Sequence, residues 1–326
     1  MASTKNTAPG IKPRTWARPT FTPRRGKVIV IPRLSKASKK PGWPIRARPV
    51  EPSSINDIIR QHPRQRLFTT PEMWADKHLQ VLNIQFQKRD ILGLPSTYEN
   101  TLGTLSTLSR TAQMLQAHNG LTRDGAIKCI RRFLYDHEIS LCANPDLLSP
   151  SLEHKSLLGT IFMTFDRNRV IYEFCSRAVR DWSCKSDCVN VADIDLTNVW
   201  EIRKRLYPYY GLTSGKVHTM EADPEDPYIA AALIAMAQSN GRAARILHPT
   251  DRLNFKAFAW ALSKDSKSLC LYRADIPRQY LDRFEMPSRH FPCDPLNISY
   301  VQVECRKTSE VERALGTFIM EMRNAC

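Results

Sequence analysis

Four acidic side chains in the C-terminal third of the chain have residue types and positions that could support metal-dependent hydrolysis. They are Asp223, Asp226, Asp275 and Glu304. A nuclease of this kind uses an Asp together with a Glu-x-Lys on adjacent strands to place a metal ion and a water molecule. Here Arg306 takes the lysine position, and arginine stays charged and cannot serve as a base. A metal-dependent nuclease or hydrolase, active or degenerate, is therefore the alternative hypothesis for function.

The acidic cluster around Asp226 also has a purely structural interpretation. Asp226-Pro227 has the form of a helix N-cap followed by proline in the first turn. Carboxylates at that end of a helix each stabilise it by about 0.3–1 kcal/mol. The chain contains neither a glycine-rich phosphate loop nor a GxSxG or HExxH motif, and its eight histidines are isolated from one another. We therefore predict no catalytic and no cofactor-binding residue.

Cys184 and Cys188 form the one cysteine pair with zinc-ligand spacing, with three residues between them. Structural zinc sites usually take two such pairs. We therefore predict no metal ligand, although a metal-binding role for this pair stays open. Several of the nine cysteines, such as Cys129 and Cys270, stand in apolar contexts where a free thiol behaves as a small hydrophobe. Reduced thiols in an intracellular compartment are expected.

The first fifty residues carry thirteen Lys and Arg and no Asp or Glu. The chain holds 48 basic and 32 acidic residues in all, which leaves 35 basic against 32 acidic residues in 51–326. Eight prolines and a single short apolar patch in this stretch predict a disordered tail over residues 1–52. Basic clusters of the kind that attract phosphates or nuclear import receptors lie within it. Their residues are Arg24, Arg25, Lys27, Lys36, Lys39 and Lys40.

Three interpretations of the tail stay open. It is a solubilising extension, an arm for nuclear targeting or for an anionic partner such as nucleic acid or an acidic protein, or a mitochondrial presequence. A presequence must form an amphipathic helix, and proline, which costs about 3 kcal/mol inside a helix, interrupts one at Pro9, Pro13, Pro19 and Pro23. No membrane span is expected because no apolar run reaches about 18 residues. Secretion is not expected either, because the N-terminus lacks the apolar core of a signal peptide.

Residues 53–214 have mainly helical patterns. The expected helix starts are Ser54 or Asn56, Thr70, Thr122, and Asp195 or Thr197. Apolar residues at helical spacing also predict helices over 74–86, 99–117, 157–165 and 170–182. This part of the chain is therefore expected to be a helical region.

Residues 215–326 combine strands with helices. An apolar helix is expected from Tyr228 to Gln238, ended by Gly241, and it should be buried because it is apolar nearly all round. Strands are expected over 255–262, 269–274 and 298–303, and a helix follows Pro277. Ser309 and Glu312 form a capping box for the last helix. The predicted fold class is α+β, with a mainly helical N-terminal half and a C-terminal module that holds a small antiparallel sheet of about three strands plus helices.

A resemblance to a known group of proteins rests on the segments DPYIAAALIAMAQ, FKAFAWAL and LCLYRADIPRQYLDRFEMPSR. Together they resemble a region found in uncharacterised proteins of filamentous fungi, in which an Asp-Pro-Tyr helix precedes a two-stranded piece and an Ile-Pro helix. The resemblance covers roughly residues 218–303, about a quarter of the chain. It implies no catalytic residue, activity or cofactor.

The concentration of positive charge in the tail favours a non-enzymatic intracellular binding protein over the hydrolase. In this hypothesis a nearly neutral folded body (53–214 and 215–326) carries a basic arm (1–52) that addresses it to the nucleus or to an anionic partner. A nuclear location is expected, with the mitochondrial matrix and the cytoplasm as alternatives.

Overall fold

The computed structural model describes residues 29–31, 49–63, 67, 69–90, 125, 130, 160–165, 168–173, 179–183, 190–210, 223–247, 254–263 and 267–324. The six basic residues of the predicted arm lie outside these ranges, as do the predicted helix over 99–117 and the Cys184–Cys188 pair. Residues 125 and 130, within the helix predicted after Thr122, are both helical.

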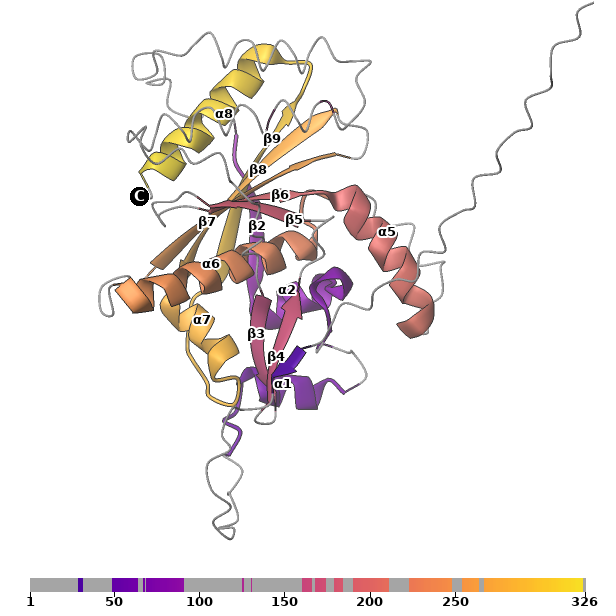
Figure 1. Ribbon diagram of the computed structural model, residues 1–326, viewed down its shortest axis with the longest axis vertical. Coiled ribbons are helices and arrows are strands. Elements are labelled where there is room, and N and C mark those ends of the chain that lie inside the picture. The colour runs from indigo at the N-terminus through magenta and orange to yellow at the C-terminus, as the bar shows by residue number, and fades with distance from the viewer. Residues whose placement is uncertain are drawn as a thin grey trace, which may run out of the picture.

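Two sheets and the helices packed on them make up the described residues (Figure 1). The larger sheet contains β2 (Ile84–Lys88), β5 (Val179–Ser183), β6 (Asn190–Ile194), β7 (Asn254–Leu262), β8 (Ser268–Pro277) and β9 (Leu296–Glu304). The smaller sheet contains β1 (Ile29–Ile31), β3 (Thr160–Phe165) and β4 (Asn168–Glu173). The helices are α1 (Ile55–Gln61), η1 (Pro71–Met73), α2 (Asp76–Leu82), α5 (Leu196–Leu206), η5 (Tyr207–Tyr210), α6 (Pro227–Leu247), α7 (Arg278–Glu285) and α8 (Thr308–Arg323).

The larger sheet is mixed, with strand order β2-β9-β8-β7-β6-β5. Its centre is antiparallel, because β8 pairs antiparallel with both β7 and β9. Parallel pairs follow on either side, β2 with β9 and β6 with β7. The predicted fold class, α+β, is confirmed at this level. The prediction of an antiparallel sheet of about three strands is wrong, because the three predicted strands are only the middle of a six-stranded mixed sheet.

Two helices predicted in the N-terminal half are strands. The segments 157–165 and 170–182 contain β3, β4 and β5. Short apolar runs do not distinguish a strand from a buried helix by their period, and the β-branched and aromatic residues in TIFMTF and NRVIYE favour the strand. The helix predicted over 74–86 also ends early, because Asn83 takes a left-handed conformation (φ 56°) and the chain continues as β2.

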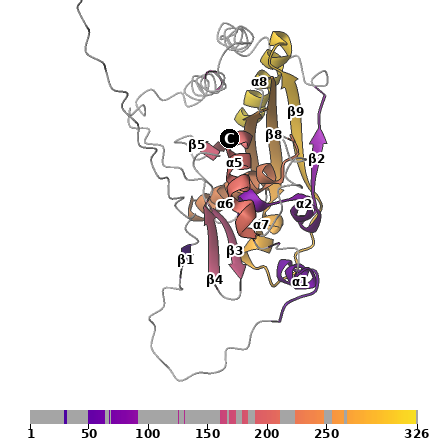
Figure 2. The ribbon, with the colours of Figure 1, turned by 90° about the vertical axis from the view of Figure 1, so that its right-hand side faces the viewer.

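The predicted disordered tail over 1–52 contains one described strand. β1 pairs antiparallel with β4, with Ile29 opposite Ile171. The apolar patch in the middle of the tail therefore joins the smaller sheet, which corrects the prediction at residues 29–31. β3 of that sheet contacts both α6 and α7 (Figure 2). At the end of the tail, the Glu51 amide donates a hydrogen bond of 2.9 Å to the carbonyl of Ser288.

Strands from both sides of the predicted boundary at residues 214 and 215 lie in one sheet. β2, β5 and β6 come from the predicted helical region, and β7, β8 and β9 come from the predicted C-terminal module.

Two of the predicted helix starts agree with the structure. Ser54 caps α1 and Asp195 caps α5, as the sequence predicts. The capping box at Ser309 is wrong, because α8 begins two residues earlier than a cap at Ser309 requires, and Lys307 at its N-cap makes no side-chain hydrogen bond to the helix.

α6 is the central helix, and it crosses in front of the larger sheet in Figure 1. Its residues from Tyr228 to Ala237 are each at most 1% exposed, so the prediction of a buried helix is confirmed. The residues of β7 that share its core cluster are all small beyond Phe255: Ala257, Ala259 and Ala261. Such side chains let a helix backbone lie close to the sheet. α6 also continues through Gly241 to Leu247, and therefore does not end at the predicted glycine.

The opposite face of the sheet packs against α8. There β7 presents large side chains, Phe258, Trp260 and Leu262, to the apolar face of that helix. Phe258 and Phe318 meet edge to face with their ring centroids 5.6 Å apart. The small residues of β7 thus face α6 and its large residues face α8.

Candidate functional site

The four carboxylates of the hydrolase hypothesis do not converge. The β8–β9 register puts Glu304 opposite Ser268, whereas Asp275 lies seven residues further along β8. At roughly 3.4 Å per residue the two acidic positions are about 24 Å apart. They also project from opposite faces, because Asp275 alternates with residues of the α6 core and Glu304 alternates with residues of the α8 core. One metal ion cannot contact both.

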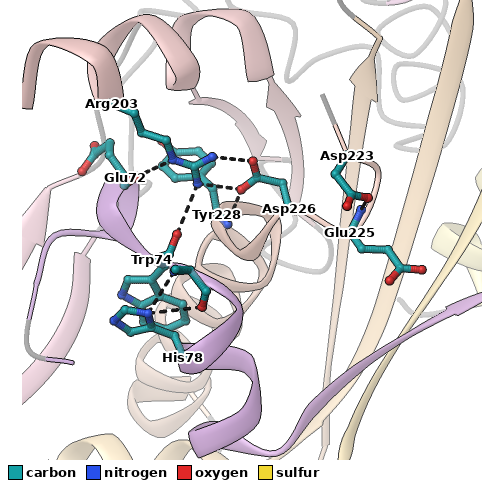
Figure 3. A network of polar contacts seen from close by, with 9 residues as sticks. Glu72, Trp74, His78, Arg203, Asp223, Glu225, Asp226 and Tyr228 are labelled. Carbon is teal, nitrogen blue, oxygen red and sulfur yellow. Dashed lines mark hydrogen bonds and ion pairs between the residues drawn. The ribbon is translucent and has the colours of Figure 1, made fainter. Parts of the chain in front are cut away.

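Asp226 is engaged in a buried ion pair (Figure 3). Its Oδ2 accepts from Arg203 Nη1 at 2.6 Å and its Oδ1 accepts from Arg203 Nη2 at 2.7 Å. Oδ1 also accepts the Tyr228 amide at 2.8 Å, which caps the first turn of α6. Both carboxylate oxygens therefore serve the fold, and the structural interpretation of this residue is confirmed.

Arg203 connects three elements that are far apart in the sequence. It lies on α5, which is capped by Asp195, whose carboxylate accepts the amides of Thr197 and Asn198. Its Nε donates to the Glu72 carbonyl of η1 at 2.6 Å, and its Nη2 faces the carbonyl of Trp74 at 3.5 Å. The guanidinium thereby joins α5, η1 and the start of α6 (Figure 3).

The electrostatics of this pair follow from its burial. The Arg203 and Asp226 side chains are only 2% and 6% exposed. Burial opposes the charge on Arg203, but the adjacent carboxylate of Asp226 overcomes this effect and raises the pKa of Arg203 above its ordinary value. A buried ion pair often contributes little net stability, yet removing one partner is costly because it leaves the other charge uncompensated. The pair therefore specifies how the elements meet.

Trp74 and His78 form a second buried contact below this pair (Figure 3). Their rings stack with centroids 5.5 Å apart and an interplanar angle of 7°. The Nδ1 of His78 accepts the Ala75 amide at 2.9 Å. Burial lowers the pKa of His78 to about 4, so the imidazole is neutral at physiological pH. These contacts give His78 a structural role at the start of α2.

A group of buried hydroxyl and thiol side chains lies between α6 and the sheet. Tyr300 donates from its hydroxyl to Glu225 Oε1 at 3.1 Å, and its ring lies 5.8 Å from that of Tyr272. Burial, with the hydrogen bond to Glu225, raises the pKa of Tyr300 to about 12. Burial likewise raises the pKa of Cys270 to about 11. These groups stay protonated at neutral pH, so none of them is a thiolate or phenolate nucleophile.

Asp223 and Glu225 lie on the opposite side of Asp226 from Arg203 (Figure 3). Asp223 Oδ1 accepts the Glu225 amide at 2.9 Å, which forms a local turn before α6. Within the described ranges, no three His, Cys, Asp or Glu side chains come close enough together to hold a metal ion. The same ranges contain no helix with the length and apolar character to cross a bilayer.

Comparison of the chain with protein-family models, with curated proteins and with solved structures finds no match. The resemblance to fungal proteins therefore stays a prediction.

The structure also shows contacts that sequence reasoning missed. Arg203 belongs to the basic run RKR, which has the pattern of a solvated helix face, and it lies 23 residues before its partner Asp226. Arg89 and Arg273 both contact Glu321 of α8, which is 232 residues from Arg89. No local signal in the sequence links residues so far apart.

Proposed function

We propose that this protein binds an anionic partner, with nucleic acid the leading class, through the basic segment of residues 1–50. The separation of charge carries the proposal, since thirteen basic and no acidic residues precede a nearly neutral remainder. Lysine and arginine displace condensed counterions from a phosphate backbone, and this contribution to binding needs neither a preformed pocket nor a fixed conformation. The same segment is proposed to direct the protein to the nucleus.

In the folded part, several charged side chains are paired with one another. Asp226 is held by Arg203, and Glu321 contacts both Arg89 and Arg273. Strand β1 lies between the two basic clusters in the sequence, because Lys27 precedes it and Lys36 follows it. The clusters thus lie within a few residues of β1 in the sequence.

The proposal is tested by titrating labelled DNA duplex and single-stranded RNA with the full chain at several salt concentrations, using fluorescence anisotropy. A variant replaces six basic residues by Ala: Arg24, Arg25, Lys27, Lys36, Lys39 and Lys40. If each contacts one phosphate, the slope of log K against log salt becomes shallower by up to about 5 on duplex DNA. The variant is expected to lose most of its affinity at low salt.

A matched control removes six basic residues from the folded part, all at exposed positions. They are Lys204, Arg205, Lys267, Arg289, Arg306 and Lys307, each replaced by Gln. The overall charge change is the same, so a non-specific effect of net charge would appear in both variants. A wild-type chain that does not bind either nucleic acid at 50 mM salt, or equal losses in both variants, would refute the proposal.

The targeting role has its own test. Residues 1–52 are fused to a fluorescent protein in eukaryotic cells, and the chain without them is expressed in parallel. We expect the fusion in the nucleus and the truncated chain outside it. Import into mitochondria would support the presequence interpretation instead. If removing the segment leaves the distribution of the chain in the cell unchanged, the segment is a solubilising extension.

A further inference from the structure

Two arginines from different parts of the fold converge on one carboxylate. Arg89 Nη1 lies 2.8 Å from Glu321 Oε1, and Arg273 Nη1 lies 3.3 Å from the same oxygen. Arg89 directly follows β2, where its amide donates to the Tyr300 carbonyl, and Arg273 lies on β8. The guanidiniums are therefore positioned by two strands of one sheet, while the carboxylate comes from α8.

A small hollow lies beside these three side chains. The polar residues that line it are Arg89, Arg273, Ser299, Tyr300, Thr317 and Glu321. Its volume of about 20 Å³ has room for roughly one water molecule. The Thr317 hydroxyl, on a side chain whose residue is only 7% exposed, has no hydrogen-bond partner within the described part of the chain. A buried hydroxyl without a partner is costly, so this position calls for a polar group in the hollow.

We infer that Arg89, Arg273 and Thr317 form a binding site for an oxyanion of the phosphate class, in which the Glu321 carboxylate occupies the ligand's place. Guanidinium groups bind carboxylate and phosphate oxygens with the same paired geometry. Glu321 stands two residues before the end of α8 and is partly exposed, so its side chain can turn outward to solvent. The space it leaves would then add to the hollow beside it.

Two features of the fold set the strength of this site. Asp275 contacts Arg273 at 2.7 Å, and the C-terminal end of α8 carries about half a negative charge. Both oppose an anion, but Asp275 is 44% exposed and therefore screened, and the two guanidiniums carry a full positive charge each. The site is expected to bind weakly in the wild type and more tightly once Glu321 is neutral.

The experiment uses the full chain with the six basic residues of the N-terminal segment already replaced by Ala, so that its outcome is independent of the proposed function. Inorganic phosphate is titrated by calorimetry at constant ionic strength, with chloride as the reference anion. Glu321→Gln is expected to bind phosphate about tenfold more tightly than the parent, which corresponds to about 1.4 kcal/mol. Arg273→Lys keeps the charge but removes the paired donors. Added to Glu321→Gln, it is expected to abolish the tenfold gain in phosphate affinity.

Thr317→Val distinguishes a ligand site from a merely structural contact. It replaces the buried hydroxyl by a methyl group of similar size, so thermal unfolding is expected to stay unchanged or rise while phosphate affinity falls. Arg306→Gln, at a position with a 72% exposed side chain outside the site, is the control and should bind like its parent. A Glu321→Gln chain that binds phosphate no better than the parent overturns the inference. A loss of phosphate affinity in Arg306→Gln equal to the loss in Thr317→Val also overturns it.

The source of the phosphate group is settled by competition in the Glu321→Gln chain. A single-stranded oligonucleotide that displaces inorganic phosphate identifies a nucleic-acid backbone as the ligand. Retention of phosphate against the oligonucleotide identifies a free phosphate or a small phosphate ester. Either result supports the site itself.

Discussion

The guanidinium of Arg203 and the carboxylate of Asp226 form two parallel hydrogen bonds of 2.6 and 2.7 Å in a buried setting. The same carboxylate caps the first turn of α6 through the Tyr228 amide. The pair is thus both an interhelical link and the start of the central helix. It fixes η1, α5 and α6 in one arrangement.

Removing one partner of this pair should be strongly destabilising. Arg203→Met leaves the Asp226 carboxylate buried without its counter-charge, and the free energy of unfolding is expected to fall by about 3–5 kcal/mol. The double variant Arg203→Met, Asp226→Leu should recover much of this loss, because no buried charge remains. Urea unfolding measures both. Lys204→Met, at a 43% exposed position on the same helix, is the control and should stay within about 0.5 kcal/mol of wild type. A similarly small effect of Arg203→Met would contradict the prediction.

The buried imidazole of His78 predicts sensitivity to acid. Its pKa is about 4 in the folded state against 6.5 for the unperturbed group. Above pH 6.5 both states are neutral, but as the pH falls towards 4 the unfolded chain binds a proton that the folded chain does not. The free energy of unfolding therefore decreases by about 3 kcal/mol from this residue over that interval.

His78→Phe tests this pH dependence because it keeps an aromatic ring stacked on Trp74 and removes the titration. Urea unfolding between pH 7 and pH 4 should show a slope lower by up to one proton in the variant. The other titrating groups are common to both chains and cancel in the comparison. Parallel curves for the two proteins would show that His78 is accessible to protons in the folded state.

The cysteines at positions 270 and 293 should differ in reactivity. Cys270 is 5% exposed and burial raises its pKa to about 11, so only about one thiol in a thousand is ionised at pH 8. Cys293 is half-buried, and Arg283 Nη1 lies 3.6 Å from its sulfur. Iodoacetamide labelling followed by peptide mass spectrometry should modify Cys293 well before Cys270. In urea the two rates should become equal, and a fast reaction of Cys270 in the folded chain would contradict its position in the core.

The small residues of β7 should not tolerate enlargement. Ala259 is fully buried in the core cluster that contains α6, and Ala259→Leu is expected to destabilise the fold by about 1–3 kcal/mol or more because the helix must move away. Asn254→Leu introduces the same side chain at the exposed start of the strand and is expected to change stability by less than about 0.5 kcal/mol. Thermal unfolding compares the two, and equal effects would show that α6 does not lie close to β7.

The sequence predicts best those elements whose signals are local. The start of α6 at Asp226-Pro227, the antiparallel pairing of β7 with β8, and the Ile276-Pro277 entry into α7 each depend on nearby residues, and the structure has them there. The end of α6 is different. One glycine costs only about 1 kcal/mol inside a helix, so Gly241 does not stop a helix that is already packed on several sides.

What could not be predicted depends on distant partners. β2 and β6 are short, and each is paired in parallel with a strand that follows much later in the chain. Strands paired in parallel cannot be joined by a tight hairpin turn, so no local signal indicates these partners. For the same reason the sequence does not indicate the proposed oxyanion site. Arg89, Arg273 and Glu321 meet only when β2, β8 and α8 are all in place. Of the four acidic residues selected from the sequence, Asp226 is the buried one, and both of its carboxylate oxygens are engaged by Arg203 and the Tyr228 amide.

The pairing of β2 with β9 affects how the protein is made. Lys88 on β2 and Gln302 on β9 are 214 positions apart. At about 5–20 residues per second, the ribosome delivers β9 roughly 10–40 s after β2. During that time the backbone amides of β2 have no native strand beside them in the larger sheet, and the nascent chain cannot complete its fold. Translation speed and chaperone capture in this interval should therefore determine the yield of native protein.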